Sequence, residues 1–303
     1  MSFKKTLLII PYFGKLPEYL NLYFKGCEKN TWLHVLIITD DEIPDSKPTN
    51  VYFQQESLIN FSKKIADIHK LKNYQLPNAY KLCDWRPSYG LIFHEEIKNY
   101  DYWAYGDLDV LYGDMQSYIL NKHELDVDFI SFRYEYLSGS LTIIKNNIFN
   151  NNLFLKIKNY LPEARKASYQ ALDEIKNRWD VMRSSLNDNQ SFSEVVYNSH
   201  LKGEIKVSLE NSICENLHER GYLIYVNNKL ILDNKEVMYF HFICNKGNYY
   251  FKFPNWKSVP SEFLIIDTGF YKKRYVTKFN SALKFYRSIP HYFFKIIAKI
   301  YKN

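Results

Sequence analysis

Apolar runs and helical spacings alternate along the first part of the chain. Continuous apolar runs predict buried strands at residues 6–10, 33–39 and 51–54, and apolar residues at helical spacing predict helices at 16–30 and 57–69. This alternation is typical of βαβ units, so the pattern predicts an α/β protein with a largely parallel sheet. Ligands of such sheets bind beyond the carboxyl ends of the strands.

The alternation continues beyond residue 80. A predicted helix at 88–97 is followed by a strand at 102–105, which runs directly into two acids. Further elements are predicted as strands at 128–132, 140–145 and 237–243, and as helices at 148–160 and 190–198.

Composition narrows the class of protein. Hydrophobic residues make up 46% of the 303 residues, enough for a sizeable core. The four cysteines are far apart and have no C-x-x-C spacing, which argues against a zinc knuckle or a disulfide scaffold and fits a reducing compartment. The apolar run near the N-terminus stops at Pro11, and no stretch reaches the roughly 20 apolar residues that cross a bilayer, so we expect a cytoplasmic protein.

The net charge of +7 is concentrated near the C-terminus. Residues 268–303 carry nine Lys or Arg and no acid, which leaves 31 basic and 33 acidic residues on the rest of the chain. The body therefore does not indicate nucleic-acid binding. Lys295, Lys299 and Lys302 recur at helical spacing, so the tail predicts a basic amphipathic helix. Such a helix either contacts an anionic membrane peripherally, at the inner face of the cytoplasmic membrane, or packs on the body of the protein.

The strand at 102–105 leads into "GDLDVLYGD", where Asp107 and Asp109 stand two residues apart. Two acids in an arbitrary loop are usually solvated turn residues. Here they close an apolar strand, where an uncompensated charge is costly, and alternate residues of an extended backbone point the same way. The pair therefore predicts a site for a hard divalent cation, Mg²⁺ or Mn²⁺, which prefers oxygen ligands.

Residues 81–114 resemble a family of bacterial glycosyltransferases with the GT-A fold, typical of capsule and lipopolysaccharide gene clusters and distantly similar to the glycogenin and bacterial galactosyltransferase group. The shared pattern is "YKLCDWRPSYG" followed by "YDYWAYGDLDVLYGD". The stretches "LLIIPYFGKLPEYLNLYFKGCEKN", "YLSGSLTIIKN" and "YFHF" extend the resemblance over most of residues 6–246. It implies a GT-A-type α/β fold, with a Rossmann-like, mostly parallel central sheet flanked by helices, and a nucleotide-sugar donor.

The same resemblance implies a set of metal ligands. Asp107 and Asp109 would hold the ion and His241 would be its third protein ligand; imidazole suits Mn²⁺ better than Mg²⁺. Taken alone, a histidine flanked by Phe is more often a core residue. Lys246 would contact the diphosphate, although "GNYY" follows it here where the distant relatives have Pro-Trp.

Two cations and an acid precede the Asp-x-Asp strand. Lys81, Asp84 and Arg86 lie before a helix predicted to begin near Pro87. A helix N-terminus with two cations favours diphosphate binding. The alternative is a surface ion pair worth about 0–1 kcal/mol.

Other candidate residues depend on their place in the fold. In a GT-A fold, Pro11, Tyr12 and Phe13 would line the site of the nucleotide base, and Asp40 would accept a hydrogen bond from the base or the ribose. Gly139, within "LSGS", lets the backbone approach the donor sugar and the acceptor closely.

Two acids are candidates for the acceptor side of the reaction. Asp188 precedes a predicted helix, where it either caps the helix or orients the acceptor hydroxyl. Glu194 is the second candidate for this catalytic role. The sequence leaves both interpretations open, as it leaves open whether the anomeric configuration is retained or inverted.

These features predict a metal-dependent hexosyltransferase that moves galactose or glucose from a UDP-sugar onto a surface polysaccharide or a lipid-linked glycan. The catalytic domain would span residues 1–253, with a nucleotide-binding half to about 114 and an acceptor half from 115, followed by a helical basic C-terminal region, 254–303. One alternative is a haloacid-dehalogenase-like phosphatase, whose Asp-x-Asp normally lies on its first strand. Another is a non-catalytic, metal-dependent sugar-binding module.

Overall fold

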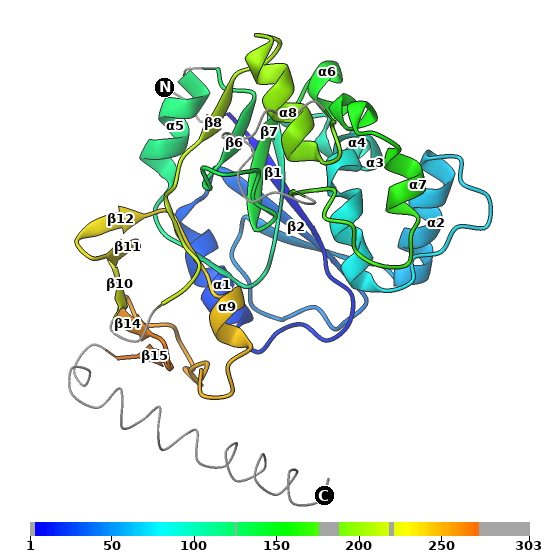
Figure 1. Cartoon of the computed structure of the whole chain (residues 1–303). Coiled ribbons are helices and arrows are strands. Elements are labelled where there is room, and N and C mark those ends of the chain that lie inside the picture. The colour runs from blue at the N-terminus through cyan, green and yellow to red at the C-terminus, as the bar shows by residue number, and fades with distance from the viewer. Residues whose placement is uncertain (1–3, 125, 176–187, 218–220, 273–303) are drawn as a thin grey trace, which may run out of the picture. The chain divides into compact units, whose positions relative to one another are not determined.

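The computed structural model describes residues 4–124, 126–175, 188–217 and 221–272 (Figure 1). The chain divides into two compact units. The larger unit consists of Met1–Pro17, Asn30–Leu108 and Met115–Asn211, and the smaller unit consists of Glu18–Lys29, Asp109–Asp114 and Ser212–Asn303.

The larger unit is built on a seven-stranded sheet of strand order β3-β2-β1-β4-β7-β6-β8. Neighbouring strands run parallel except that β7 is antiparallel to both β4 and β6. The strands are β1 (Thr6–Pro11), β2 (Leu33–Thr39), β3 (Val51–Gln55), β4 (Tyr102–Gly106), β6 (Phe129–Ser131), β7 (Leu141–Lys145) and β8 (Val207–Leu209). The prediction of an α/β fold with a mostly parallel central sheet is confirmed, and the arrangement is consistent with the GT-A type.

Helices cover the sheet of the larger unit. They are α2 (Leu58–Ile68), the 3₁₀ helix η1 (Ala79–Ser88), α3 (Tyr89–Ile92), α4 (His94–Ile97), α5 (Gln116–Glu124), α6 (Ile148–Asn151), the 3₁₀ helix η2 (Leu153–Lys156), α7 (Tyr160–Ala164) and α8 (Phe192–Leu201). The main core packs alternate sheet residues such as Ile9, Trp103 and Ile144 against apolar side chains of these helices, among them Phe61 and Trp85. Strands β1 and β4 appear in the sequence as continuous apolar runs because both faces of each strand are buried.

The described residues of the smaller unit form two sheets, of whose strands the sequence pattern predicted only the one at 237–243. A three-stranded sheet has the order β5-β13-β9, and a five-stranded antiparallel sheet has the order β12-β11-β10-β14-β15. Its elements are α1 (Leu20–Lys29), β5 (Val110–Tyr112), β9 (Ile213–Cys214), β10 (Tyr222–Val226), β11 (Lys229–Leu232), β12 (Lys235–Val237), β13 (Tyr239–His241), α9 (Ile243–Lys246), β14 (Glu262–Ile266) and β15 (Gly269–Tyr271). Helix α1 lies directly against β5, where a Cβ on Gly26 would come within 2.6 Å of the backbone nitrogen of Tyr112.

Two helix predictions are wrong in detail. The helix expected at 88–97 is present but is divided at Phe93 into α3 and α4, and Pro87 does not begin it, because Pro87 lies inside η1. Asn78 caps η1 by accepting a hydrogen bond from the backbone N–H of Lys81. The helix expected at 148–160 is broken into α6, η2 and the start of α7. Ile157 is extended there and Asn159 has a left-handed backbone, φ +56°, which asparagine tolerates better than most residues.

Most of the basic C-terminal region, with its predicted amphipathic helix, lies outside the described residues. Strands β14 and β15 continue the five-stranded sheet beyond Phe253. None of the described helices has the length and apolarity that a membrane span requires.

Candidate metal centre

His241 is positioned by the three-stranded sheet of the smaller unit. It is the last residue of β13, and it pairs across the antiparallel ladder with Val110 of β5. Asp109 is the residue before Val110, and the backbone N–H of Phe242 donates to the carbonyl oxygen of Asp109, 3.1 Å away. The register of β5 on β13 therefore sets Asp109 beside His241.

The Asp109 carboxylate is buried and has two nitrogen partners. His241 Nε2 lies 3.5 Å from Asp109 Oδ1, and Lys246 Nζ lies 2.6 Å from Asp109 Oδ2. Burial alone would raise the pKa of Asp109, but its contacts with His241 and Lys246 outweigh burial and hold that pKa well below the usual range. The charged carboxylate is therefore the stable form, which is the form that binds a cation.

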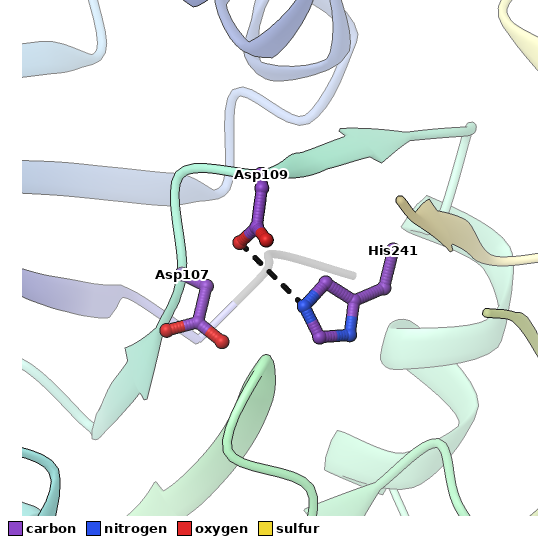
Figure 2. Close-up of side chains that lie close together, drawn as sticks. All are labelled: Asp107, Asp109 and His241. Atoms are coloured by element: carbon purple, nitrogen blue, oxygen red, sulfur yellow. Dashed lines mark ion pairs between the residues drawn. The ribbon is translucent and has the colours of Figure 1, made fainter. Parts of the chain in front are cut away.

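Asp107 is joined to Asp109 through a single residue, Leu108. One ligand atom from each of Asp107, Asp109 and His241 lies within 4.8 Å of the other two. Figure 2 shows the Asp109 carboxylate directed at the imidazole, with Asp107 beside them. The predicted Asp-x-Asp pair and the late histidine are thus gathered in one cluster.

The donor set of this cluster fits a divalent cation such as Mn²⁺. Two carboxylates and one imidazole are ligands that Mn²⁺ accepts. His241 also has the outer partner that metal-binding histidines usually have, because its Nδ1 lies 3.1 Å from Glu215 Oε1. Asp107, Asp109 and His241 are therefore the residues that would hold the ion.

Within the larger unit, Asp107 is bound by a buried arginine. Arg86 Nη2 donates to Asp107 Oδ1, and Arg86 Nη1 donates to Asp173 Oδ2 and to the carbonyl oxygen of Gly139, both at 3.0 Å. Gly139 in turn donates its backbone N–H to Glu174 Oε1 at 2.7 Å. Arg86 and Gly139, both predicted from the sequence, therefore lie around Asp107 together with two acids that were not predicted.

Burial raises the pKa values of both acids, Asp173 and Glu174. It raises the pKa of Asp173 to about 7, against the opposing effect of Arg86. Burial also raises the pKa of Glu174. A Cβ on Gly139 would meet Arg86 Nη1 at 2.8 Å, Glu174 Oε1 at 2.9 Å and Asp173 Oδ2 at 3.3 Å, so glycine is required here for three side chains to converge.

Lys81 and Asp84 form an ion pair in which neither side chain is exposed. Lys81 Nζ donates to Asp84 Oδ2 at 2.7 Å and to the carbonyl oxygens of Glu163 and Ser168. Asp84 also accepts from the backbone N–H groups of Gln170 and Leu172. Other protein groups therefore satisfy the hydrogen bonds of both side chains, and these bonds link residues 163–172 to η1. The diphosphate-binding role of the pair remains a prediction.

The β1 and β2 candidates lie at the same edge of the sheet as Asp107. β1, β2 and β4 are parallel, so the residues that follow Pro11, Thr39 and Gly106 meet at one edge. Asp40 Oδ1 accepts from the backbone N–H of Gly14, whose φ of +96° favours glycine, and so shapes the loop that carries Tyr12 and Phe13.

Asp188 is exposed, and Glu194 lies in the first turn of α8. Ser191 caps this helix by accepting from the backbone N–H of Glu194, and Glu194 Oε2 accepts from the backbone N–H of Gln190 at 2.6 Å. This reciprocal arrangement is close to a capping box, a helix-stabilising motif. No contact joins either acid to the metal cluster among the residues that the structure describes, and their catalytic roles remain predictions.

Three acids of this region could not be found from the sequence pattern: Asp173, Glu174 and Glu215. Asp173 and Glu174 lie in a stretch without helical or strand periodicity. Glu215 follows a strand of only two residues. One general rule could have suggested further acids near Arg86: an arginine that is buried needs carboxylate partners, and Arg86 has two of them.

These observations define an α/β protein with a candidate Asp-Asp-His metal centre, whose two acids follow the fourth strand of a mostly parallel sheet. The chain belongs to a family of unknown function, described as "Family of unknown function (DUF6625)", whose model matches residues 8–274. No curated protein matches the chain.

Two solved structures of one protein are similar to the chain. They are the apo form of the glycosyltransferase GlyE of Streptococcus pneumoniae TIGR4, with a TM-score of 0.28 over 68% of this chain, and a second GlyE structure, with a TM-score of 0.24 over 55% of this chain. The identity is 10% in each case, and the match spans 45% of the GlyE chain. The α/β fold is defined by the strand order and strand directions of the larger unit.

Proposed function

We propose that this protein is a metal-dependent glycosyltransferase that moves a hexose, galactose or glucose, from a UDP-sugar onto a surface polysaccharide or a lipid-linked glycan. The observation that carries the proposal is the cluster of Asp107, Asp109 and His241, whose two acids follow β4 at the carboxyl edge of a mostly parallel sheet. Ligands of such sheets bind at this edge. The phosphatase alternative requires its Asp-x-Asp on the first strand, whereas here the acids follow the fourth.

The residues around the cluster fit the binding of a nucleotide diphosphate. A bound divalent ion supplies positive charge that neutralises the departing diphosphate. Lys246, whose side chain is 38% exposed, offers an ammonium group beside Asp109 for the same phosphates. Pro11, Tyr12, Phe13 and Asp40, at the ends of β1 and β2, would receive the base and the ribose.

Glu174 is the acid that we assign to the acceptor side. It is held by Gly139 and lies near Arg86, the residue that binds Asp107, and it is partly exposed where Asp173 is fully buried. Glu174 would take the proton of the acceptor hydroxyl as that oxygen bonds to the anomeric carbon. The bond from that carbon to the diphosphate oxygen breaks, and its electron pair leaves with the diphosphate.

The donor assignment is tested by thermal shift with UDP-, GDP-, CMP- and dTDP-sugars, each with and without Mn²⁺. We expect a UDP-hexose together with Mn²⁺ to raise the melting temperature by roughly 3–6 °C at a donor concentration of about 100 Kd. Release of UDP in the presence of a glycan acceptor would follow. Absence of any shift, together with hydrolysis of p-nitrophenyl phosphate in Mg²⁺, would overturn the proposal in favour of the phosphatase.

The acceptor-side assignment is tested with Glu174→Gln. We expect transfer to fall about 100-fold or more, while the affinities for UDP-sugar and Mn²⁺ stay within about twofold of wild type, because the change removes only a proton acceptor. Glu194→Gln tests the other candidate acid: if Glu194 acts only in the cap of α8, this change lowers stability and leaves transfer intact. Loss of transfer in Glu194→Gln but not in Glu174→Gln would reverse the assignment.

A further inference from the structure

The strand register of the smaller unit places an unassigned acid beside the candidate metal ligand His241. β9 runs parallel to β13 with Ile213 opposite Tyr239 and Cys214 opposite Phe240. The next position on each strand is Glu215 and His241, and Glu215 Oε1 lies 3.1 Å from His241 Nδ1. His241 therefore stands between Glu215 on the β9 side and Asp109 on the β5 side.

This placement has a chemical consequence for the imidazole ring. A neutral imidazole has one N–H donor and one lone-pair acceptor, and a carboxylate can only accept. Glu215 therefore favours the tautomer with its proton on Nδ1, which leaves the lone pair on Nε2. Glu215 is the nearer of the two carboxylates, at 3.1 Å from Nδ1 against 3.5 Å between Nε2 and Asp109 Oδ1, so in the neutral ring its effect prevails and the Nε2 lone pair is left for a cation held by Asp109.

The two acids that flank His241 differ in exposure. Asp109 and His241 are each 6% exposed at the side chain, whereas Glu215 is 24% exposed. A group at the rim of the cluster is suited to orienting the ring and contributes little core packing. Its replacement is therefore expected to leave the fold intact.

We propose that Glu215 is the positioning residue of the metal centre: by accepting the Nδ1 proton of His241, it presents Nε2 to the cation and raises the affinity of the site. This inference deepens the proposed function and rests on it, because it concerns the same ion. Replacing an outer partner of a metal-binding histidine typically costs 10–100-fold in metal affinity.

The experiment compares Glu215→Leu and Glu215→Gln with the wild-type chain, using Mn²⁺ alone as the probe. Free Mn²⁺ is measured by electron paramagnetic resonance. We expect Glu215→Leu to weaken Mn²⁺ binding about 10–100-fold, and Glu215→Gln to weaken it less, because the amide oxygen can still accept the Nδ1 proton. The surface variant Glu236→Leu, which removes an ion pair with Lys229 in the same unit, should bind Mn²⁺ as wild type does.

A second measurement determines which ring nitrogen of His241 carries the proton. Nitrogen-15 NMR of the metal-free protein, recorded at a pH high enough for the His241 ring to be neutral, should show the proton on Nδ1 in wild type and in Glu215→Gln, and a mixture of tautomers in Glu215→Leu. Unchanged Mn²⁺ affinity and an unchanged tautomer in Glu215→Leu would overturn the inference. Failure of the wild-type chain to bind Mn²⁺ would instead overturn the metal dependence of the proposed function, and the NMR result would still decide whether Glu215 orients His241.

Discussion

Among the lysine–aspartate pairs of the described residues, one in each unit can be compared, because the two have nearly equal lengths and different surroundings. Lys81 and Asp84 of the larger unit are 2.7 Å apart, and Lys246 and Asp109 of the smaller unit are 2.6 Å apart. Neither member of the first pair is exposed, and Lys81 donates to two further carbonyl oxygens. Lys246 is 38% exposed, and its one ion-pair partner within the described part of the chain is Asp109.

The first pair has the surroundings of a structural ion pair, whereas the second leaves its ammonium group exposed to solvent. A fully buried pair is stable only when its remaining protons and oxygens find partners, and Lys81–Asp84 has them. Asp109 instead shares its carboxylate with an exposed ammonium and an imidazole, and it lies two residues from another acid. Loss of Asp84 should therefore affect folding, and loss of Asp109 should affect metal binding and turnover.

The largest expected effect follows from Asp109→Asn. We expect the rate of transfer from a UDP-sugar to fall at least about 1,000-fold, because the ion that neutralises the leaving diphosphate loses a ligand. The free energy of unfolding should change by only about 1 kcal/mol, since asparagine keeps the size of the side chain. Initial rates at saturating Mn²⁺ and urea denaturation measure the two quantities. Turnover at the wild-type rate would remove Asp109 from the metal site.

The converse experiment is Asp84→Ala. It leaves the ammonium of Lys81 buried without its carboxylate and frees two backbone N–H groups, so we expect a loss of about 3–5 kcal/mol of stability. Lys246→Met is the matched control in the second pair, expected to cost roughly 1–2 kcal/mol because water can reach Asp109 when the exposed lysine is removed. Urea denaturation compares the two variants. Equal losses of unfolding free energy in the two variants would contradict the distinction between the two pairs.

The same contrast shows what the sequence could predict. The apolar runs of β1, β2 and β4 are long and bounded by turn residues, so the sheet of the larger unit was predictable. In the smaller unit, β5 has three residues and β9 has two, lengths at which no period can be recognised. Those short strands are held by pairing with β13, which is an interaction over more than a hundred residues of sequence for β5.

The residues of the candidate site likewise fall into those that the sequence could predict and those that it could not. Asp107, Asp109 and His241 could be predicted because the acids end an apolar strand and because the motifs resemble a known family, and the structure brings them together. Glu215 could not, because it enters only through the register of β9 on β13. For Lys81 and Asp84 the sequence leaves two interpretations open, because cations near an acid suggest a ligand site and also occur where the protein itself supplies the partners, as it does here.

Two buried histidines, His241 and His123, also differ in their surroundings. His241 lies between two carboxylates, whereas His123 in α5 stacks on Tyr102, with ring centroids 4.5 Å apart. Neither nitrogen of His123 has a hydrogen-bond partner among the described residues. Burial lowers the pKa of His123 to about 4; Lys4 adds to this effect and Asp101 opposes it. His123 is therefore a neutral core residue, the role that the isolated sequence context also allowed for His241.

The smallest expected effect concerns acid stability. The unfolded chain protonates His123 near pH 6.5 and the folded chain only near pH 4, so the unfolded state binds more protons and stability falls as the pH drops between these values. His123→Phe keeps the stacking and removes this proton, so it should retain about 1–2 kcal/mol more of its neutral-pH stability than wild type at pH 4.5. His69, whose pKa burial also lowers to about 4, still contributes its own loss in both chains. Urea denaturation at pH 7 and pH 4.5 gives the four free energies, and parallel losses in the two chains would show that His123 titrates as an exposed histidine does.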